Sequence, residues 1–313
     1  MAAFIARRLL SGVFLLFVIS SLTYFLLFFS TSNLALNILG DLATAEQLAA
    51  KEAELGLDRP ILERWSEWLI AAAQGDFGKS WFNNQPIVDS LTQRLPVTLT
   101  LVGITITLAA ILATLLGMLA AVRGGWIDKV VQMLAVAGFA IPNFVVAIFI
   151  VSLVAIQLKL LPATGWVPFE LSPELWLKSL ILPVLSLVLA TVASSAQQIR
   201  SAIKTNLEKD WVRTLRARGL RESEILFKHV LRASAPAGLT VLSLQFVGML
   251  GGTVIIEQIF ALPGMGFLAV QSTSLGDTPV VMGVVVYTVI IVIIVNLLVD
   301  LANGWLNPKV RVK

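Results

Sequence analysis

The chain has 313 residues, of which 57% are hydrophobic and 13% are charged, and its formal net charge is +4. Soluble domains average about 45–50% apolar and about 25% charged residues, so this chain lacks the polar surface of a soluble protein and is expected to lie in a membrane. It contains no cysteine and a single histidine, His229. These counts exclude disulfides, thiolate ligands and metal centres built from several histidines, and we expect neither a metal nor a cofactor.

Six long stretches contain no Asp, Glu, Lys or Arg. Each is long enough for an α-helix to cross the bilayer, which takes about 20 residues. Because lipid offers no hydrogen-bond partner, a spanning segment must pair its own backbone groups, and this favours helices. The sequence therefore predicts an all-α integral membrane protein with six transmembrane helices. The stretches are residues 9–40, 95–122, 130–158, 179–199, 233–256 and 278–299.

The first stretch follows Arg7 and Arg8, as it would in a secretory or twin-arginine signal. It is longer than the apolar region of a signal, which has about 7–15 residues, and the rest of the chain is equally apolar. We therefore interpret residues 1–40 as an uncleaved transmembrane helix.

The placement of charge predicts the orientation. With a cytoplasmic N-terminus, 16 of the 23 Lys and Arg residues lie on the inner side and 13 of the 19 Asp and Glu residues on the outer side. Cytoplasmic loops carry the excess of basic residues, so both termini are expected in the cytoplasm. The eight tryptophans lie in loops or near the ends of the stretches, as expected for rings at the membrane interface.

Residues 41–94 form a predicted external loop that is too long for a simple connector. Thr44-Ala-Glu-Gln47 has the spacing of a capping box, and Asp58-Arg-Pro60 indicates a second helix start. Apolar residues then recur at helical spacing until Gly75. The sequence predicts a small, partly helical segment on the outer face, which either rests on lipid or docks an external partner.

The same loop contains Gly75-Asp-Phe-Gly-Lys-Ser80, which looks like the end of a phosphate-binding loop. The full pattern needs a glycine at the position of Ala73 and a preceding apolar strand, and both are missing. This excludes nucleotide binding here. We expect a subunit that is not itself an enzyme, with any ATP hydrolysis carried by another chain.

The predicted cytoplasmic loop, residues 200–236, has an amphipathic pattern. Leu207, Trp211 and Leu215 are spaced by four residues and form one apolar stripe, Gly219 interrupts it, and a second apolar segment follows from Leu220. The surroundings are basic, which alone would attract anionic lipid. The stripe and the glycine break favour instead a helix, a turn and a second helix that dock into a groove on a cytoplasmic partner.

Asp210-Trp-Val-Arg-Thr-Leu-Arg-Ala-Arg-Gly-Leu220 is similar to the coupling motif of ABC importer permeases, and the chain resembles the oligopeptide, dipeptide and nickel permease family. In the wider superfamily the motif begins Glu-Ala-Ala, where this chain has Arg213-Thr-Leu215, and Gly219 takes the place of the motif's glycine. The resemblance covers nearly the whole chain. Other matching segments are residues 55–60, 75–80, 94–96, 257–266, 277–279, 296–300 and 307–309.

The resemblance implies a type I ABC importer permease fold in the inner membrane of a prokaryote. It divides the chain into a first helix at 1–40, the external loop at 41–94 and a permease core at 95–313. It also implies a second, homologous permease subunit, two cytoplasmic ATPase subunits and an external substrate-binding protein. Peptides are the expected cargo, and nickel complexes, glutathione or another small solute remain open.

The expected site residues fall into three groups. The ATPase-coupling group implied by the resemblance is Trp211, Arg213, Thr214, Leu215, Arg216, Ala217, Arg218, Gly219 and Leu220. The group expected to shape the external mouth and meet the binding protein, unless it is a plain loop, is Glu257, Phe260, Pro263 and Gly264. Gly248 and Gly252 have the G-x-x-x-G spacing of close helix packing, favoured here within the subunit. His229 is expected to be a surface or groove contact.

Two other classes of membrane protein are disfavoured. An ion-coupled secondary transporter usually carries ionisable residues at mid-membrane, and here these stretches are free of charge. A membrane-embedded enzyme needs a general base, and the only histidine is predicted to be cytoplasmic.

Overall fold

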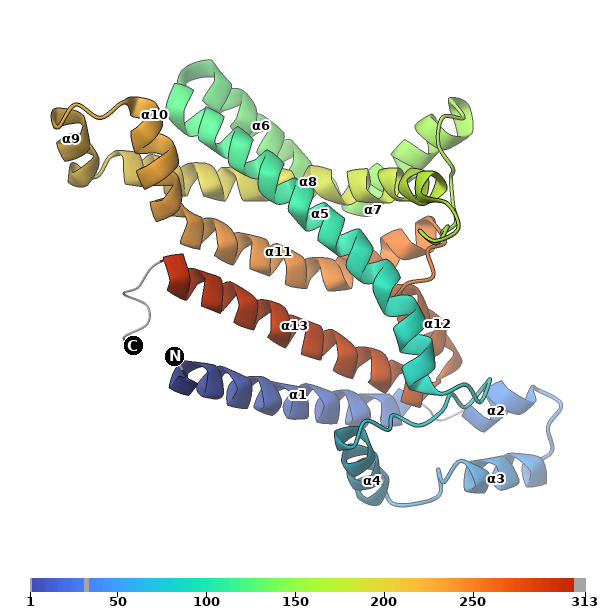
Figure 1. The fold of residues 1–313 in the computed structure, drawn as a ribbon. Helices are drawn as coiled ribbons and strands as arrows, with labels where there is room; N and C mark the ends of the chain where they lie inside the picture. The colour runs from blue at the N-terminus through green and yellow to red at the C-terminus, as the bar shows by residue number, and fades with distance from the viewer. Residues whose placement is uncertain (1, 31–33, 307–313) are drawn as a thin grey trace. The chain divides into compact units, whose positions relative to one another are not determined.

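Figure 1 shows the fold in a computed structural model, which describes residues 2–30 and 34–306 and their side chains other than those of residues 2–4, 29, 30 and 139. The predicted motif at residues 307–309 and the basic residues after it lie outside this range. Over the described residues the secondary structure is helical, apart from one antiparallel bridge between Lys79 and Pro86, and this confirms the all-α class.

The chain forms two compact units. One contains Leu99–Leu262 and the chain from Val295 onward, and we call it the 99–262 unit. The other contains Ala2–Thr98 and Pro263–Ile294, and we call it the 2–98 unit.

Among the described residues, five helical stretches are long and apolar enough to cross a membrane. They contain the helices α1 (Ala2–Ser30), α5 (Ile87–Arg123), α8 (Pro173–Leu207), α11 (Leu231–Ile259) and α13 (Thr278–Leu306). Within the first predicted stretch the structure describes α1 to Ser30 and then α2 (Leu34–Leu39), whose Leu34 and Ala35 are buried.

The remaining predicted stretch, residues 130–158, is not one straight helix. It contains α6 (Gly125–Ala140) and α7 (Asn143–Ile150), which continues as the π-helical turn η1 (Val151–Gln157), and the two parts are bent by 91°. Pro142 causes the break, because proline has no N–H to donate and forces the preceding Ile141 into an extended conformation with ψ 119°. Counted as one bent span, this pair brings the number to six.

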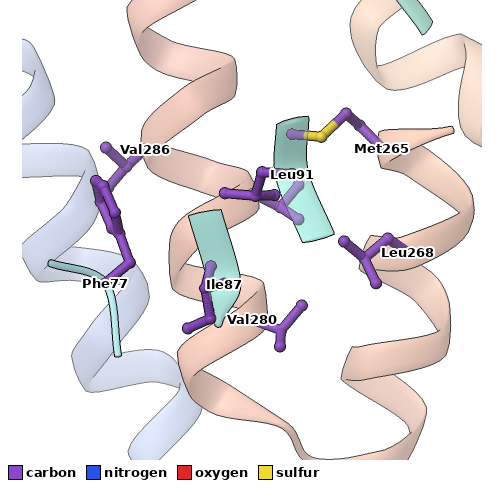
Figure 2. Close-up of a cluster of buried hydrophobic side chains, with 8 residues drawn as sticks. Phe77, Ile87, Leu91, Met265, Leu268, Val280 and Val286 are labelled. Atoms are coloured by element: carbon purple, nitrogen blue, oxygen red, sulfur yellow. The ribbon is translucent and has the colours of Figure 1, made fainter. Parts of the chain in front are cut away.

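The 2–98 unit is held by a buried apolar cluster. Figure 2 shows Ile87 and Leu91, at the start of α5, among side chains from α12 (Met265–Leu275) and α13. A methyl group added at Gly283 of α13 would lie 2.5 Å from a methyl of Ile87, so only glycine allows this approach. The buried members of the cluster are Phe77, Ile87, Leu91, Met265, Leu268, Val280, Val284 and Val286.

The helices predicted in residues 41–94 are present. In α3 (Ala45–Glu54) the Thr44 and Gln47 side chains bond each other's backbone N–H, which completes the predicted capping box. The helix α4 (Ile61–Ala73) begins after Pro60 and ends just before Gly75, whose φ of +86° is left-handed.

Helix α4 packs its tryptophans on α1. The Trp65 ring lies 6.0 Å from that of Phe17, and the Trp68 ring lies 5.9 Å from that of Tyr24. Leu62, which the periodicity placed on the same face, is 63% exposed. Part of the apolar face of α4 is therefore used inside the unit, and part remains open.

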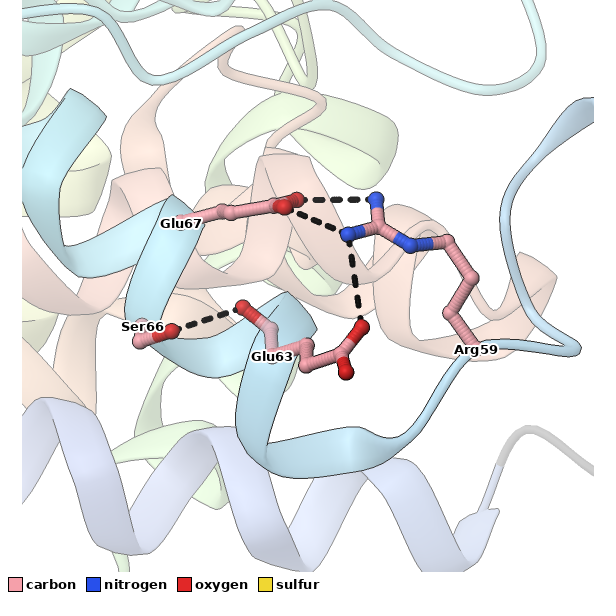
Figure 3. A network of polar contacts seen from close by, with 4 residues as sticks. All are labelled: Arg59, Glu63, Ser66 and Glu67. Carbon is pink, nitrogen blue, oxygen red and sulfur yellow. Dashed lines mark hydrogen bonds and ion pairs between the residues drawn. The ribbon is translucent and has the colours of Figure 1, made fainter.

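A carboxylate–guanidinium network fixes the entry to α4. Arg59 donates to both carboxylate oxygens of Glu67 and lies 3.7 Å from the nearer oxygen of Glu63, as Figure 3 shows. The hydrogen bonds from Arg59 hold the pKa of the Glu67 carboxyl below its ordinary value. Because these groups are exposed, the network orients the loop more than it stabilises the fold.

The segment that looked like a phosphate-binding loop has a structural role. The hydroxyl of Ser80 donates to one carboxylate oxygen of Asp277 at 2.5 Å, and the N–H of Trp81 donates to the other at 3.2 Å. Asp277 precedes α13 and is only 3% exposed. Burial raises the pKa of Asp277, and the bonds from Ser80 and Trp81 oppose that rise. These bonds join residues 75–81 to the start of the last helix.

We predict that Asp277→Ala destabilises the protein by about 1.5–3 kcal/mol, since it leaves two donors without their charged acceptor. Asp277→Asn, which keeps an acceptor and has no charge to bury, should lose less. The melting temperature of the detergent-solubilised protein measures both.

The two variants also test the sign of the pH dependence. The raised pKa means that the folded state holds the Asp277 proton more tightly, so its contribution is full at low pH and falls as pH rises through the folded pKa. The melting temperature of wild type relative to Asp277→Asn should therefore fall as the pH rises above about 4, the ordinary pKa of an aspartate. A relative melting temperature that rises with pH would contradict a raised pKa of Asp277.

Candidate functional site

The predicted coupling segment folds as a short helix on the 99–262 unit. Helix α8 ends at Leu207, and α9 (Asp210–Ala217) follows with Asp210 in its first turn and Arg216 in its last, each placed favourably for the helix dipole. Gly219 then has a φ of +80°, and its N–H bonds the carbonyl of Arg216. A residue with a Cβ is strained at this angle, so glycine is what ends α9 here.

After the turn, α10 (Glu222–Glu224) and the π-helical η2 (Ile225–Val230) lead into α11. The predicted sequence of helix, glycine turn and second helix is therefore confirmed. The single histidine, His229, lies half-buried in η2. In the part of the chain that the structure describes, no group of three or more His, Cys, Asp or Glu residues is arranged to hold a metal.

The apolar stripe of α9 faces the chain's own core. Leu207, Trp211 and Leu215 pack against a buried cluster, which we call the α9 seat. Because Leu207, Trp211 and Leu215 are half-buried, part of the stripe is used inside the chain, and its fit into a partner's groove stays a prediction. The buried residues of the seat are Ala113, Ala196, Ile199, Ile203, Val212, Ile225 and Val230.

The opposite side of α9 is polar and open. We call it the α9 outer face, and it consists of Arg213, Thr214, Ala217, Arg218 and Gly219, all of them exposed. The Arg213 side chain is 74% exposed and lies 3.3 Å from a carboxylate oxygen of Asp210. Leu220, the last predicted coupling residue, is half-buried against the seat. The α9 outer face is therefore basic, and the half-buried Trp211 and Leu215 lie on the opposite side of the helix.

An ion pair closes the turn behind this face. The Arg216 guanidinium donates to the Glu222 carboxylate at 2.6 and 3.2 Å, and these hydrogen bonds lower the pKa of Glu222 and raise that of Arg216. Both side chains are largely exposed, so the pair is expected to add less than about 1 kcal/mol. Its effect is to hold α9 and α10 across Gly219.

Helix α8 is braced just before the coupling segment. Arg200 donates to both carboxylate oxygens of Asp128 on α6, and the two side chains are 11% and 16% exposed. A methyl group added at Gly117 of α5 would lie 2.9 Å from the backbone oxygen of Ala196. The sequence placed Asp128 and Arg200 on the cytoplasmic side of the membrane and did not predict their contact. Their opposite charges at the ends of two apolar stretches were the available signal for this contact.

The residues predicted for the external mouth are not alike in exposure. Glu257 is fully buried and Phe260 is 2% exposed, while Pro263 is exposed and Gly264 is buried. The carbonyl of Phe260 accepts a hydrogen bond from the N–H of Gly165 at 2.8 Å. Glu257 and Phe260 therefore shape this segment from inside and do not present side chains to a protein partner in this structure.

Gly248 and Gly252 are exposed, and a methyl group added at either would meet no described atom within 4 Å. Among the described residues, neither glycine therefore makes the close helix contact that its spacing predicts. The two glycines instead line a hollow of about 350 Å³ in the 99–262 unit.

The comparisons with known proteins cover both parts of the chain. Residues 113–312 match the family described as binding-protein-dependent transport system inner membrane component, and residues 1–102 match the description of the N-terminal part of such a component. The chain belongs to the family of binding-protein-dependent transport system inner membrane components. It is therefore a non-catalytic ABC importer permease subunit of the bacterial inner membrane, and the predicted resemblance is confirmed.

Relatives match this permease over its whole length. A protein of Brucella abortus (strain 2308) named putative peptide transport system permease protein is 35% identical over 99% of both chains. The glutathione transport system permease protein GsiC of Shigella flexneri serotype 5b is 32% identical over 100% of both chains.

A solved structure supports the fold of the permease. A chain of the methionine ABC transporter MetNI in inward-facing conformations aligns with a TM-score of 0.53 and 14% identity. The alignment covers 69% of the permease and 96% of that chain. At this identity the likeness shows the fold alone.

The permease offers a test of the α8 brace. Asp128→Ala leaves the guanidinium of Arg200 largely buried without its carboxylate, and we predict a loss of about 1.5–3 kcal/mol. The measurement is the melting temperature of the purified permease.

The matched control exchanges the charges. Asp128→Arg combined with Arg200→Asp should recover part of the loss that either substitution causes alone. Additive losses in the double variant would contradict a direct contact.

Proposed function

We propose that the chain is one of two permease subunits of an ATP-driven peptide importer, with six membrane spans and both termini in the cytoplasm. The full-length similarity to a peptide permease supports the cargo. The excess of Lys and Arg in residues 1–8, 123–129 and 200–232 supports the orientation. The observation that supports the coupling mechanism is the seating of α9, with Val212 buried, Trp211 and Leu215 half-buried and a basic face exposed.

In this proposal two cytoplasmic ATPase subunits drive transport, and one of them binds the α9 outer face. A binding partner can shift a conformational equilibrium of the permease only to the extent that its affinities for the two conformations differ. The ATPase must therefore bind the outer face more tightly in one state than in the other. Because packed interiors are dense and stiff, a force on α9 reaches α8 and α5 through the seat.

A homologous permease would complete the passage, and an external binding protein would deliver the cargo. We propose residues 41–94 as the part that meets this protein, supported by the exposed portion of α4, which includes Leu62. Residues 257–264 would support the external mouth, with Glu257 and Phe260 acting from the buried side and Pro263 and Gly264 in the turn.

Glutathione is the second candidate cargo. A relative that is 32% identical over its whole length is named a glutathione permease. Glutathione is itself a small peptide, so both candidates share amide chemistry and differ in their charge and length.

Copurification tests the assembly. The tagged chain, isolated from its native membrane in mild detergent, should carry two ATPase chains, a second permease and a binding protein whose retained ligand is a peptide by mass spectrometry. An assembly without an ATPase would contradict the proposed mechanism. A retained ligand that is not a peptide would contradict the cargo alone.

We predict that Gly219→Pro uncouples ATP hydrolysis from uptake while the permease still inserts. Proline fixes φ near −65°, which is incompatible with the +80° at this turn, and it removes the N–H that bonds Arg216. The measurement is the number of ATP molecules hydrolysed per peptide imported by the reconstituted assembly.

Gly40→Pro is a matched control. Gly40 also follows a helix, has a φ of +82° and donates its N–H to a helix carbonyl, but it lies in the other unit and far from α9 in sequence. It should leave the ratio of ATP to peptide unchanged. Normal coupling in Gly219→Pro would refute the role of this turn.

A further inference from the structure

The hollow beside Gly248 and Gly252 is built from three elements of the 99–262 unit. The break between α6 and α7 contributes Asn143, α8 contributes Thr191 and Ser194, and α11 contributes Gln245 with the two glycines. Its volume of about 350 Å³ falls in the range of small-ligand pockets, about 300–1,000 Å³. It is therefore large enough for a short piece of cargo.

Some polar groups of the hollow are already engaged. The amide nitrogen of Gln245 donates to the Ser194 hydroxyl oxygen at 2.7 Å, and the Thr191 hydroxyl donates to the carbonyl of Leu187 at 2.8 Å. The first bond joins α11 to α8, and the second lies within α8. They also fix the Gln245 carboxamide at the edge of the hollow.

Other polar groups of the hollow can still form hydrogen bonds. Within the described residues, the Asn143 carboxamide and the carbonyl oxygen of Gln245 make no hydrogen bond. The first backbone N–H groups of α7 also lack helical partners, because Pro142 interrupts the ladder. Non-helical backbone at membrane depth is tolerated where it lines a cavity, since lipid offers it no partner. The hollow therefore offers both donors and acceptors to an occupant.

The described residues that line the hollow carry no ionisable side chain. Recognition here depends on hydrogen bonding and shape and not on charge. A carboxamide both donates and accepts, as a peptide bond does, so Asn143 and Gln245 complement the amide backbone of a peptide.

We propose that this hollow binds the peptide backbone of the cargo during passage, with Asn143 and Gln245 as its hydrogen-bonding groups. The proposal rests on the proposed peptide importer and deepens it by assigning a site. Gly248 and Gly252 keep the hollow open, because no described atom lies close enough to require a glycine at either position.

The rival occupant is a helix of the second permease, for which small residues would give a close approach. A close helix contact does not need unpaired carboxamides or a recess next to a helix break. The polar lining therefore favours the peptide, and the test below includes the helix as an outcome.

The experiment compares Gly248→Leu with Gly251→Leu in the complete assembly, reconstituted with its ATPases and binding protein. Gly251 is exposed on the same helix and has equal space for a side chain, but it does not line the hollow. With trialanine as the probe, Gly248→Leu should lower uptake at least about tenfold, as expected for a blocked pocket. Gly251→Leu should stay within about twofold of the unaltered assembly.

A second pair tests the hydrogen bonds at constant size. Asn143→Leu should lower trialanine uptake several-fold at saturating binding protein, and Asn143→Gln, which keeps the carboxamide, should restore most of it. A merely structural role for Asn143 would give equal losses in both variants.

The natural chain has no cysteine, so Gly248→Cys supplies one unique thiol on it. Its alkylation by a small maleimide in the assembly should be slowed by trialanine during turnover. A thiol that is blocked with or without trialanine, or a Gly248→Leu chain that no longer retains the second permease, would identify the hollow as a subunit interface and overturn the proposal.

The two proposals fail in different ways. If the unaltered assembly does not import trialanine, the proposed cargo fails and the site falls with it. If the unaltered assembly imports trialanine and Gly248→Leu behaves like Gly251→Leu, only the assignment of the hollow is wrong.

Discussion

The interior of a bilayer cannot hydrogen bond to a polypeptide backbone, and this constraint underlies the architecture of the chain. Five of the described helical stretches satisfy it mainly by pairing within the helix, although α5, α8 and α11 each contain a proline that has no N–H to donate. The break at Pro142 departs from it, because α6 ends and α7 begins where each helix leaves backbone groups without helical partners. Such a departure is sustainable beside a cavity, and the hollow lined by Asn143 and Gln245 lies at this break.

The proposed coupling depends on close packing between helices and not on a cavity. The stripe of Leu207, Trp211 and Leu215 packs against the α9 seat, which contains residues of α5, α8 and η2, so a displacement of α9 would act on these elements. The pair of Arg200 and Asp128 and the close approach at Gly117 join α8 to α6 and α5. An ATPase that holds the exposed side of α9 would therefore act on several helices through one contact.

Sequence alone predicted the features set by local chemistry. The absence of charge located the spans, the pattern at Thr44 and Gln47 gave the capping box, and Gly219 marked the turn. The sequence could not show which part of the protein, or which other protein, packs against a given apolar surface. The stripe of α9 has the same periodicity whether it faces another protein or its own core, and Gly248 and Gly252 have the same spacing whether they pack against a helix or line a hollow. Charge-free stretches likewise mark apolar residues without showing that Pro142 bends one of them.

Helix α8 links the two sites, since both lie in the 99–262 unit and both use this helix. Ser194 lies on the wall of the hollow, and Ile203 lies in the α9 seat. At about 1.5 Å per residue, the two positions are about 14 Å apart along one uninterrupted helix. A displacement of α9 that tilts α8 would therefore move Ser194 relative to Gln245 on α11, and the bond between them at 2.7 Å is the contact that would change. Under the proposed mechanism, α8 would connect the α9 contact with the ATPase to the proposed cargo hollow, so a change of state in the ATPase would alter the hollow.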